Sequence, residues 1–448
     1  MLLRAVSSTS PMATCIHLLV FTLLLLLIPI SNAALRPSEV VIPVQKDVET
    51  SQYVATIKMR TPLVPVKVVV DLAGTLLWVD CDDGYISSSY RPTPCGSAKC
   101  QLAKGIGCLS CNLEPRPGCT NDTCSVFPYN PIKNSLMTGG LSEDVIAIQS
   151  TDGKNPGAVA VIHPFPFSCA TTSHLEGLAR GAKGMLGLSR SSTALPTQLA
   201  SQFSKFPQVF ALCLSSSPNS NGTMFFGNKR YMLNPNNDVD YSKSLTYTPL
   251  IINPVSTAPI YSEGDQSDEY FIQVKSININ AKRVPINTTL LSFDKDGVGG
   301  TKISTATPYT TLHTSIYKAV TQAFANAAAS MKMSRVASVA PFGVCFSSKS
   351  IKRTRMGPLV PAIDLVLHSQ DVYWSISRSN SMVQVKDGVM CLGLVDAGKN
   401  PRTSIVIGGH QLEDNLLQFD LASSMLGFTS SLLGHGTNCA NFNFTSKV

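Results

Sequence analysis

The residues that could do acid–base chemistry lie in two turns, each of which follows a short apolar strand. The first segment, 67–79, reads KVVVDLAGTLLWV and places Asp71 in its turn, and the second, 302–312, reads KISTATPYTTL and places Ser304 there. Two facing carboxylates can share one proton and act together as acid and base. Ser304 can hydrogen-bond Asp71 but cannot replace a second carboxylate, so the sequence predicts no working pair. A lone, hydrogen-bonded Asp71 is expected to ionise near its ordinary pKa of about 4.

The rest of the sequence offers no replacement for this pair. It lacks a His-Glu-x-x-His zinc motif and a glycine-rich phosphate loop with its Lys, and Gly187-Leu-Ser-Arg-Ser191 lacks the final Gly of a nucleophile elbow. Cys108-Leu-Ser-Cys111 could be half of a zinc site, but no second pair of suitable spacing accompanies it. His410 is expected to be hydrogen-bonded locally rather than to act as a base. We therefore expect no enzyme activity, no cofactor and no bound metal.

The elements that must position the two turns form a repeated pattern. A glycine strand follows each turn, GMLGL at 184–188 and IVIGG at 405–409, with 116 residues from Asp71 to Gly187 and 104 from Ser304 to Gly408. This repetition predicts a duplicated lobe. With 30 Gly and 28 Pro, the composition favours an all-β fold with a few short helices. A half-buried strand is expected over 270–279, and helices over 196–204, 314–332 and around 412–416.

The N-terminal segment indicates an exported protein. Residues 17–30 read HLLVFTLLLLLIPI and are followed by Ser31-Asn32-Ala33, a pattern typical of a cleaved signal peptide. A membrane anchor is the alternative interpretation, although the run is shorter than the ~20 residues that span a bilayer. The expected divisions are a signal peptide over 1–33, a first lobe over 34–228, a connection over 229–244 and a second lobe over 245–448.

Charge and composition narrow the class of partner. Of the 448 residues, 14% are charged and 44% hydrophobic, which excludes a disordered chain and a coiled coil. There are 36 Lys+Arg against 28 Asp+Glu, and because Arg4 leaves with the signal peptide the mature surplus is +7. This surplus favours retention on acidic cell-wall polysaccharide. Nucleic acid is a poor fit, since no dense basic run has interleaved aromatics.

The cysteines and glycosylation sequons agree with export. After Cys15 is removed with the signal, the even number that remains predicts disulfides. Eight lie between Cys81 and Cys169 and can pair among themselves, and we predict the pairs Cys345–Cys391 and Cys213–Cys439. The twelve are Cys81, Cys95, Cys100, Cys108, Cys111, Cys119, Cys124, Cys169, Cys213, Cys345, Cys391 and Cys439. N-glycosylation is predicted at Asn121, Asn221, Asn287 and Asn443.

Several segments resemble pepsin-like aspartic proteases. VVVDLAGTLLWVDC is similar to their first active-site loop, and GAKGMLGLSRSSTALPTQLAS, VYWSISRSNSMVQV and IVIGGHQLEDNLLQFDLASSMLGF are similar to later segments. The cysteines, GVGGTKIST, GPLVPAIDLVL and NCANFNFTS resemble the plant group of extracellular dermal glycoproteins, basic 7S globulins and xylanase inhibitors. The resemblance implies a bilobal fold with two pseudo-symmetric, β-barrel-like lobes. It also implies secretion into the extracellular space, apoplast or cell wall.

The same resemblance shows where this chain departs from an active protease. The first loop reads Asp71-Leu-Ala73 where the family has Asp-Thr-Gly, and Ser304 replaces the second catalytic aspartate. Asp71 and Ser304 are therefore vestigial, and the resemblance implies a pseudoenzyme. The position of the family's flap tyrosine falls at Ile132, with Tyr129 three residues away.

For function, the resemblance implies inhibition of microbial cell-wall-degrading glycoside hydrolases, with a xylanase or xyloglucan endoglucanase as the protein partner. In the glycoprotein branch a blocking Arg precedes a Gly-Pro-x-Val-Pro segment, and Arg355 matches it. That branch has a second blocking Arg three residues before the last cysteine, and this chain departs from the pattern because it has Gly436 there. In the xylanase-inhibitor branch a His lies four residues before the last cysteine, and His435 matches it. Such cations could bind the paired carboxylates of a hydrolase cleft.

Two other functions stay open from the sequence. One is an atypical but active aspartic endopeptidase that depends on Asp71, and the other is a storage or peptide-binding globulin. Asp71 can instead be purely structural, by accepting hydrogen bonds from backbone donors in a buried turn. The basic run 349–355 (KSIKRTR) can likewise be an ordinary solvated surface.

Overall fold

The computed structural model describes residues 37–228, 230–234 and 238–445. The predicted signal peptide lies outside the described residues, as do parts of the predicted connection. Among the described helices, none is long and apolar enough to cross a membrane.

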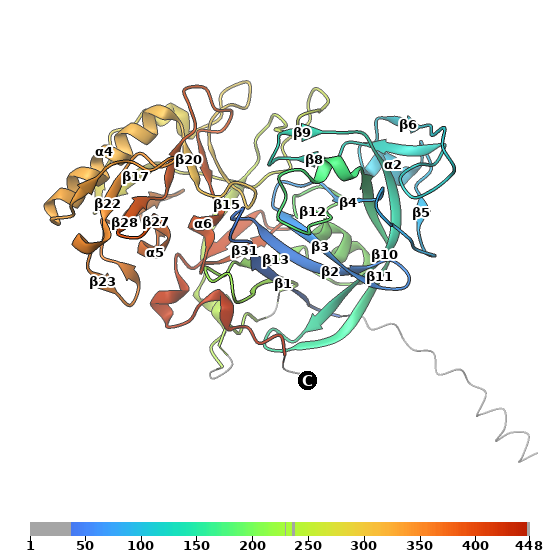
Figure 1. Ribbon diagram of the computed structural model, residues 1–448, viewed down its shortest axis with the longest axis horizontal. Helices are drawn as coiled ribbons and strands as arrows, with labels where there is room; N and C mark the ends of the chain where they lie inside the picture. Colours follow the sequence, from blue (N-terminus) through green and yellow to red (C-terminus); the bar gives the residue numbers. More distant parts are fainter. Residues whose placement is uncertain (1–36, 229, 235–237, 446–448) are drawn as a thin grey trace, which may run out of the picture. The chain divides into compact units, whose positions relative to one another are not determined.

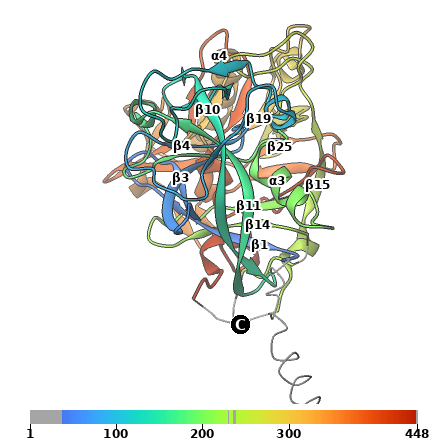
Figure 2. The same cartoon turned by 90° about the vertical axis from the view of Figure 1, so that its right-hand side faces the viewer.

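Strands are the main regular elements of the first half of the chain (Figure 1). Its two longest strands, β10 and β11, form an extended antiparallel hairpin that runs from Leu141↔Ser168 to Thr151↔Pro156 (Figure 2). The strands are β1 Val40–Lys46, β2 Tyr53–Met59, β3 Val64–Asp71, β4 Leu77–Asp80, β5 Arg91–Pro92, β6 Gly107–Leu109, β7 Thr123–Val126, β8 Tyr129–Asn130, β9 Ser135–Leu136, β10 Gly139–Thr151, β11 Pro156–Ala170, β12 Gly184–Gly187, β13 Val209–Cys213 and β14 Gly222–Phe226.

The second half adds shorter strands and the longest described helix, α4. Its strands are β15 Thr246–Ile251, β16 Phe271–Ile272, β17 Ser276–Ile279, β18 Lys282–Arg283, β19 Thr301–Ile303, β20 Thr310–Leu312, β21 Arg335–Val336, β22 Cys345–Ser347, β23 Arg353–Thr354, β24 Gly357–Pro358, β25 Ile363–Val366, β26 Tyr373–Ile376, β27 Met382–Lys386, β28 Val389–Leu392, β29 Leu394–Asp396, β30 Ile405–Ile407, β31 Leu416–Asp420 and β32 Met425–Phe428. The described helices of the whole chain are α2 Ala98–Leu102, α3 Leu195–Gln202, α4 Thr314–Ser330, α5 Arg378–Ser381 and α6 Gly409–Leu412.

The predicted duplication appears in the strand pairing. In the first half, β12 pairs parallel with β3 and antiparallel with β4, while β4 pairs parallel with β11. In the second half, β30 pairs parallel with β19 and antiparallel with β20, while β20 pairs parallel with β29. Each half therefore presents one turn, after β3 or β19, beside the end of a glycine-containing strand.

The two halves share a core. β13 pairs antiparallel with β31 over five residues, from Val209↔Asp420 to Cys213↔Leu416. Across this pairing the rings of Phe210 and Phe419 stack with their centroids 4.7 Å apart. Both side chains are fully buried, so removing either would open a cavity between the halves.

Helix α4 follows its apolar spacing closely. Ile316, Val320, Phe324 and Ala328 recur every four residues and are buried on one face. His313 caps the N-terminus, where its Nδ1 accepts a hydrogen bond of 3.1 Å from the amide of Ser315. The helix ends at Ser330, and Lys332 just beyond it has a φ of +61°, so the predicted end at 332 is two residues too late.

Six disulfides are present among the described residues. The predicted pairs Cys345–Cys391 and Cys213–Cys439 are both confirmed. The eight cysteines between 81 and 169 pair among themselves, as Cys81–Cys169, Cys95–Cys108, Cys100–Cys124 and Cys111–Cys119. Four of these disulfides therefore lie in the first half, and the Cys213–Cys439 bond links the middle of the chain to its C-terminal segment.

Candidate functional site

Asp71 is the last residue of β3 and lies almost fully buried, with 3% of its surface exposed. Its carboxylate accepts a hydrogen bond of 2.9 Å from the amide of Ala73, and its carbonyl oxygen accepts from the amides of Gly74 and Leu188 at 3.2 and 2.9 Å. Burial raises the pKa of Asp71 to about 6, although the Ala73 amide opposes this shift. The expectation of an ordinary pKa is therefore wrong, because desolvation outweighs the hydrogen bonds.

Ser304 occupies the corresponding turn after β19, and its hydroxyl is used within that turn. Its Oγ accepts hydrogen bonds of 3.2 Å from both the amide and the Oγ1 of Thr307. The Ser304 side chain therefore accepts hydrogen bonds from within its own turn. The Asp71 carboxylate accepts its hydrogen bond from the amide of Ala73.

The neighbouring residue, Thr305, brings the two turns together. Its Oγ1 donates a hydrogen bond of 2.7 Å to the carbonyl oxygen of Val70 and accepts one of 3.1 Å from the amide of Leu72. The two turns therefore meet through Thr305, with the carboxylate of Asp71 in the first turn and the hydroxyl of Ser304 in the second. Such a site can hold one proton but cannot divide acid and base roles between two carboxyl groups.

Two charged residues near this site were missed by the sequence reasoning. Lys302 Nζ lies 2.7 Å from Glu269 Oε1, and Glu269 Oε2 accepts a hydrogen bond of 2.5 Å from Thr257 Oγ1. The negative charge of Glu269 raises the Asp71 pKa, and the positive charge of Lys302 lowers it. Lys302 lies in β19, two residues before Ser304, and this spacing could have predicted that it lies near the Asp71 turn.

A small hairpin, β8–β9, also lies close to Asp71. Tyr129 pairs with Leu136 in this hairpin, and Ile132 belongs to its turn. The carbonyl oxygen of Tyr129 accepts a hydrogen bond of 3.2 Å from Trp78 Nε1. Burial raises the pKa of Tyr129, and the negative charges of Asp71 and Glu269 raise it further. Tyr129, rather than Ile132, is therefore the residue of this hairpin that interacts electrostatically with the Asp71 turn.

The two predicted inhibitor contacts lie on exposed loops that are close to each other. Arg355 is in the turn of the β23–β24 hairpin, and His435 ends a 3₁₀ turn at Leu432–His435. A Cβ placed on Gly434 would lie 3.4 Å from the Cε of Met356, so the Met356 side chain, next to Arg355, lies close to the backbone beside His435. The His435 ring also packs against Tyr241, with centroids 6.1 Å apart. The structure therefore brings both candidates onto one surface.

The remaining predicted modification sites are all accessible. Asn121, Asn221, Asn287 and Asn443 are exposed. The Oδ1 atom of Asn121 accepts a hydrogen bond of 2.7 Å from the amide of Cys111.

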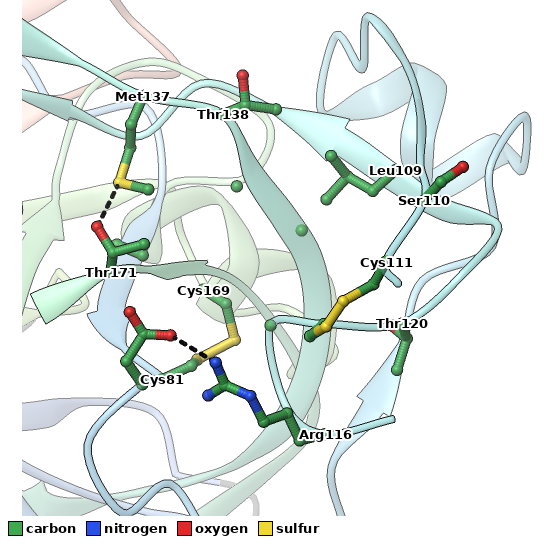
Figure 3. A pocket seen from close by; sticks show the side chains of 16 residues that line it. Cys81, Leu109, Ser110, Cys111, Arg116, Thr120, Met137, Thr138, Cys169 and Thr171 are labelled. Carbon is green, nitrogen blue, oxygen red and sulfur yellow. Dashed lines mark hydrogen bonds and ion pairs between the residues drawn. A yellow bond between two sulfur atoms is a disulfide. The ribbon is translucent and has the colours of Figure 1, made fainter. Parts of the chain in front are cut away.

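A cavity of about 250 Å³ lies elsewhere, beside two first-half disulfides (Figure 3). Its lining includes Cys81–Cys169 and Cys111–Cys119, together with Arg116, whose Nη2 lies 3.2 Å from Asp82 Oδ1. Neither Asp71 nor Ser304 lines it. The cavity is therefore separate from the two-turn site and from the surface of Arg355 and His435.

Comparison with known proteins places this geometry in a family. A family model described as xylanase inhibitor N-terminal matches residues 53–228, and one described as xylanase inhibitor C-terminal matches residues 269–430. A protein of Nicotiana benthamiana named probable aspartic proteinase GIP2 is 54% identical over 436 residues, covering 96% of this chain and 98% of that protein.

Solved structures of related proteins have the same fold as this chain. The crystal structure of edgp has a TM-score of 0.90 and 57% identity, covering 93% of this chain and all of that chain. Basic 7S globulin from soybean has a TM-score of 0.79 and 38% identity, covering 91% and 99%. An aspartic proteinase from Irpex lacteus, at 14% identity and a TM-score of 0.56 with 91% and 100% covered, shares the fold. The chain therefore belongs to the xylanase-inhibitor family and has the bilobal fold of pepsin-like aspartic proteinases.

Proposed function

We propose that this protein is a secreted, catalytically inactive relative of aspartic proteases that binds and inhibits microbial cell-wall-degrading glycoside hydrolases in plant defence. The observation that carries the proposal is the closeness of the Met356 side chain to Gly434, since these residues are the sequence neighbours of the exposed Arg355 and His435. The description of the matching family as xylanase inhibitors supports the same partner class.

The chemistry of the partner matches this surface. Glycoside hydrolases carry two carboxyl groups that flank the bond to be cleaved. A guanidinium such as that of Arg355 can form two parallel charge-assisted hydrogen bonds with one carboxylate. His435, when protonated, could bind the second carboxylate, so that the inhibitor occupies the place of the sugar.

Loop rigidity supports the proposal. Thr354 Oγ1 donates a hydrogen bond of 2.8 Å to the carbonyl oxygen of Gly357 and accepts one of 3.2 Å from the amide of Met356, which closes the tip around Arg355. On the tail side, the Cys213–Cys439 disulfide fixes the chain four residues after His435. Pre-ordered loops lose less entropy when they bind a partner.

Catalytic inactivity is supported by the single carboxylate of the two-turn site. An active endopeptidase is nevertheless a testable alternative, because the relative from Nicotiana benthamiana is named a proteinase. We expect purified protein to show no acid proteolysis above the level of the Asp71→Asn variant, with or without pepstatin. Proteolysis that both Asp71→Asn and pepstatin abolish would establish the alternative.

Export is supported by the six disulfides, since such bonds persist in oxidising compartments. Exposure of all four sequon asparagines is compatible with N-glycosylation. We propose accordingly that the mature protein is a glycoprotein of the extracellular space.

Titration of xylanases and xyloglucan endoglucanases with the purified protein tests the inhibitory function. We expect Arg355→Ala to weaken inhibition about 30-fold or more, as for a central interface arginine, and His435→Ala to weaken it about 10-fold. Arg353→Ala is the matched control, because Arg353 is an exposed cation of the same hairpin but lies on β23 rather than at the tip. Unchanged hydrolase turnover across a broad panel, with no complex on gel filtration, would refute the proposal.

A further inference from the structure

We infer that the second half of the chain carries a binding surface for linear polyuronates, the acidic polysaccharides that bear one carboxylate on each sugar. The surface, here called the cationic face, comprises Lys332, Arg335, Lys349, Lys352, Arg353 and Lys386. All six side chains are exposed. The inference does not depend on hydrolase inhibition, because neither Arg355 nor His435 belongs to the face.

The positive charge of the chain is concentrated in this region. Residues 331–392 contain eight Lys and Arg against three Asp, a net charge of +5. The whole mature chain has a surplus of only +7, so a segment of 62 residues carries most of it. A charge of one sign gathered in this way attracts polyanions more strongly than the same charge spread over the surface.

Strand pairing places two of these cations, Arg335 and Lys386, at one end of a small sheet. The sheet has the order β21-β22-β28-β27, and its end is defined by the pairs Arg335↔Phe346, Ser347↔Val389 and Lys386↔Val389. Neighbouring strands lie about 4.8 Å apart, so the outer strands β21 and β27, which carry Arg335 and Lys386, are separated by about 14 Å. β22, β27 and β28 lie side by side at the left of Figure 1.

Two hydrogen bonds bring the intervening loop to the same end. The amide of Ser334 donates to Ser350 Oγ at 2.9 Å, which holds Arg335 beside the loop that carries Lys349. The amide of Ser348 donates to the carbonyl oxygen of Gly388 at 2.9 Å, which holds that loop beside the β27–β28 turn. Arg335, Lys349 and Lys386 are therefore neighbours in space, although 51 residues separate the first from the last.

These cations differ in their partners from several exposed lysines of the first half. In the first half Lys133, Lys154 and Lys183 lie within 2.7 Å of carboxylates of Glu176, Asp238 and Asp83. Within the described residues, no cation of the face has a carboxylate within 4.0 Å. Asp387 in the β27–β28 turn is the acidic residue nearest to them in sequence. Their charges are therefore available to an external polyanion.

A polyuronate suits the face better than nucleic acid does. The disulfides indicate an oxidising compartment, outside the cytosol and nucleus. The face is an open surface of separate cations, which fits a flexible chain with regularly spaced carboxylates. Binding by several separate ion pairs should weaken steeply as salt is added.

Binding to immobilised polygalacturonate at low and moderate salt tests the inference, with the full mature protein. The test variant is Lys332→Gln/Lys349→Gln/Lys386→Gln. The matched control, Lys58→Gln/Lys67→Gln/Lys205→Gln, removes the same charge from exposed lysines of the first half. We expect affinity to fall about tenfold or more in the test variant and less than about twofold in the control, with a shallower salt dependence in the test variant alone.

Three results would overturn the inference. Equal losses in the two variants would mean that net charge, and not this face, governs binding. Unchanged affinity in the test variant would mean that other residues bind the polymer. Equal binding of wild type to fully methyl-esterified polygalacturonate would mean that carboxylates are not recognised. Thermal unfolding of both variants checks that each is folded, and hydrolase inhibition should be the same in both.

Discussion

Thr305 Oγ1 lies 2.7 Å from the carbonyl oxygen of Val70 and donates a hydrogen bond to it, although 235 residues separate them. The same oxygen accepts a hydrogen bond of 3.1 Å from the amide of Leu72. One hydroxyl from the second lobe therefore satisfies two backbone groups on either side of Asp71. Leu72 has an apolar, fully buried side chain, so it provides no side-chain hydrogen bond in return.

Replacing Thr305 with Val should therefore destabilise the protein. The variant keeps the shape of the side chain but leaves the Val70 carbonyl and the Leu72 amide buried and unpaired, which costs about 2–4 kcal/mol for the two groups. Urea unfolding monitored by tryptophan fluorescence measures the change. Thr305→Ser keeps the hydroxyl and should lose less than about half as much; equal losses in both variants would show that the hydrogen bonds are unimportant.

Asp71 should make stability depend on pH in an unusual direction. Its folded pKa of about 6 exceeds the ordinary value of 3.8 because the group is desolvated. Between these values the folded state binds more protons than the unfolded state, so this residue's contribution to stability falls as pH rises from about 4 to about 6. The total loss is about 3 kcal/mol at most, from about two pKa units.

The measurement is the difference in unfolding free energy between wild type and Asp71→Asn from pH 4 to 7. Asn cannot ionise, so wild type should lose stability relative to the variant across this range. Asp296→Asn, which alters an exposed carboxylate, should give a flat difference. A flat difference for Asp71→Asn as well would contradict the raised pKa.

Local patterns predicted the elements but not their electrostatic surroundings. The period of buried residues identifies α4, and the repeated strand–turn pattern identifies the β3 and β19 turns. By contrast, the strand expected over 270–279 is split into β16 and β17, because Lys275 between them donates its amide to Val366 of β25. Asp71 is buried by segments from both lobes, and Glu269 is 198 residues away in sequence. Only the tertiary fold determines such contacts, as it does the closeness of the Met356 side chain to Gly434.

Glu413 provides a second, opposite pH effect. It is buried between the lobes, where Lys46 Nζ and Tyr53 Oη lie 2.6 and 2.8 Å from its Oε1, and His410 Nδ1 lies 3.3 Å from its Oε2. Burial alone would raise the Glu413 pKa, but His410 and Lys46 together hold it below the ordinary value. The stability from this group is therefore present above about pH 4.5 and is lost as pH falls through the folded pKa.

Glu413→Gln should accordingly cost about 3 kcal/mol at pH 7, because it leaves the Lys46 ammonium without its buried partner. Glu176→Gln is the matched control, since the Glu176–Lys133 pair is largely exposed, with side chains 72% and 44% accessible. An exposed pair contributes less than about 1 kcal/mol. Equal losses by urea unfolding would mean that the Glu413 cluster adds nothing beyond an ordinary surface pair.

The Cys213–Cys439 disulfide should link stability to the inhibitor surface. It joins residues 226 apart in the sequence, and removing such a bond typically costs about 2–5 kcal/mol. The Cys213→Ser/Cys439→Ser variant should also loosen the turn at Leu432–His435 and so remove most of the contribution of His435 to hydrolase binding. His435→Ala added to this variant should then weaken inhibition much less than it does in wild type. Cys111→Ser/Cys119→Ser is the control, since this bond closes a short loop in the first lobe. If His435→Ala weakened inhibition as much without Cys213–Cys439 as it does in wild type, the disulfide would not position the histidine.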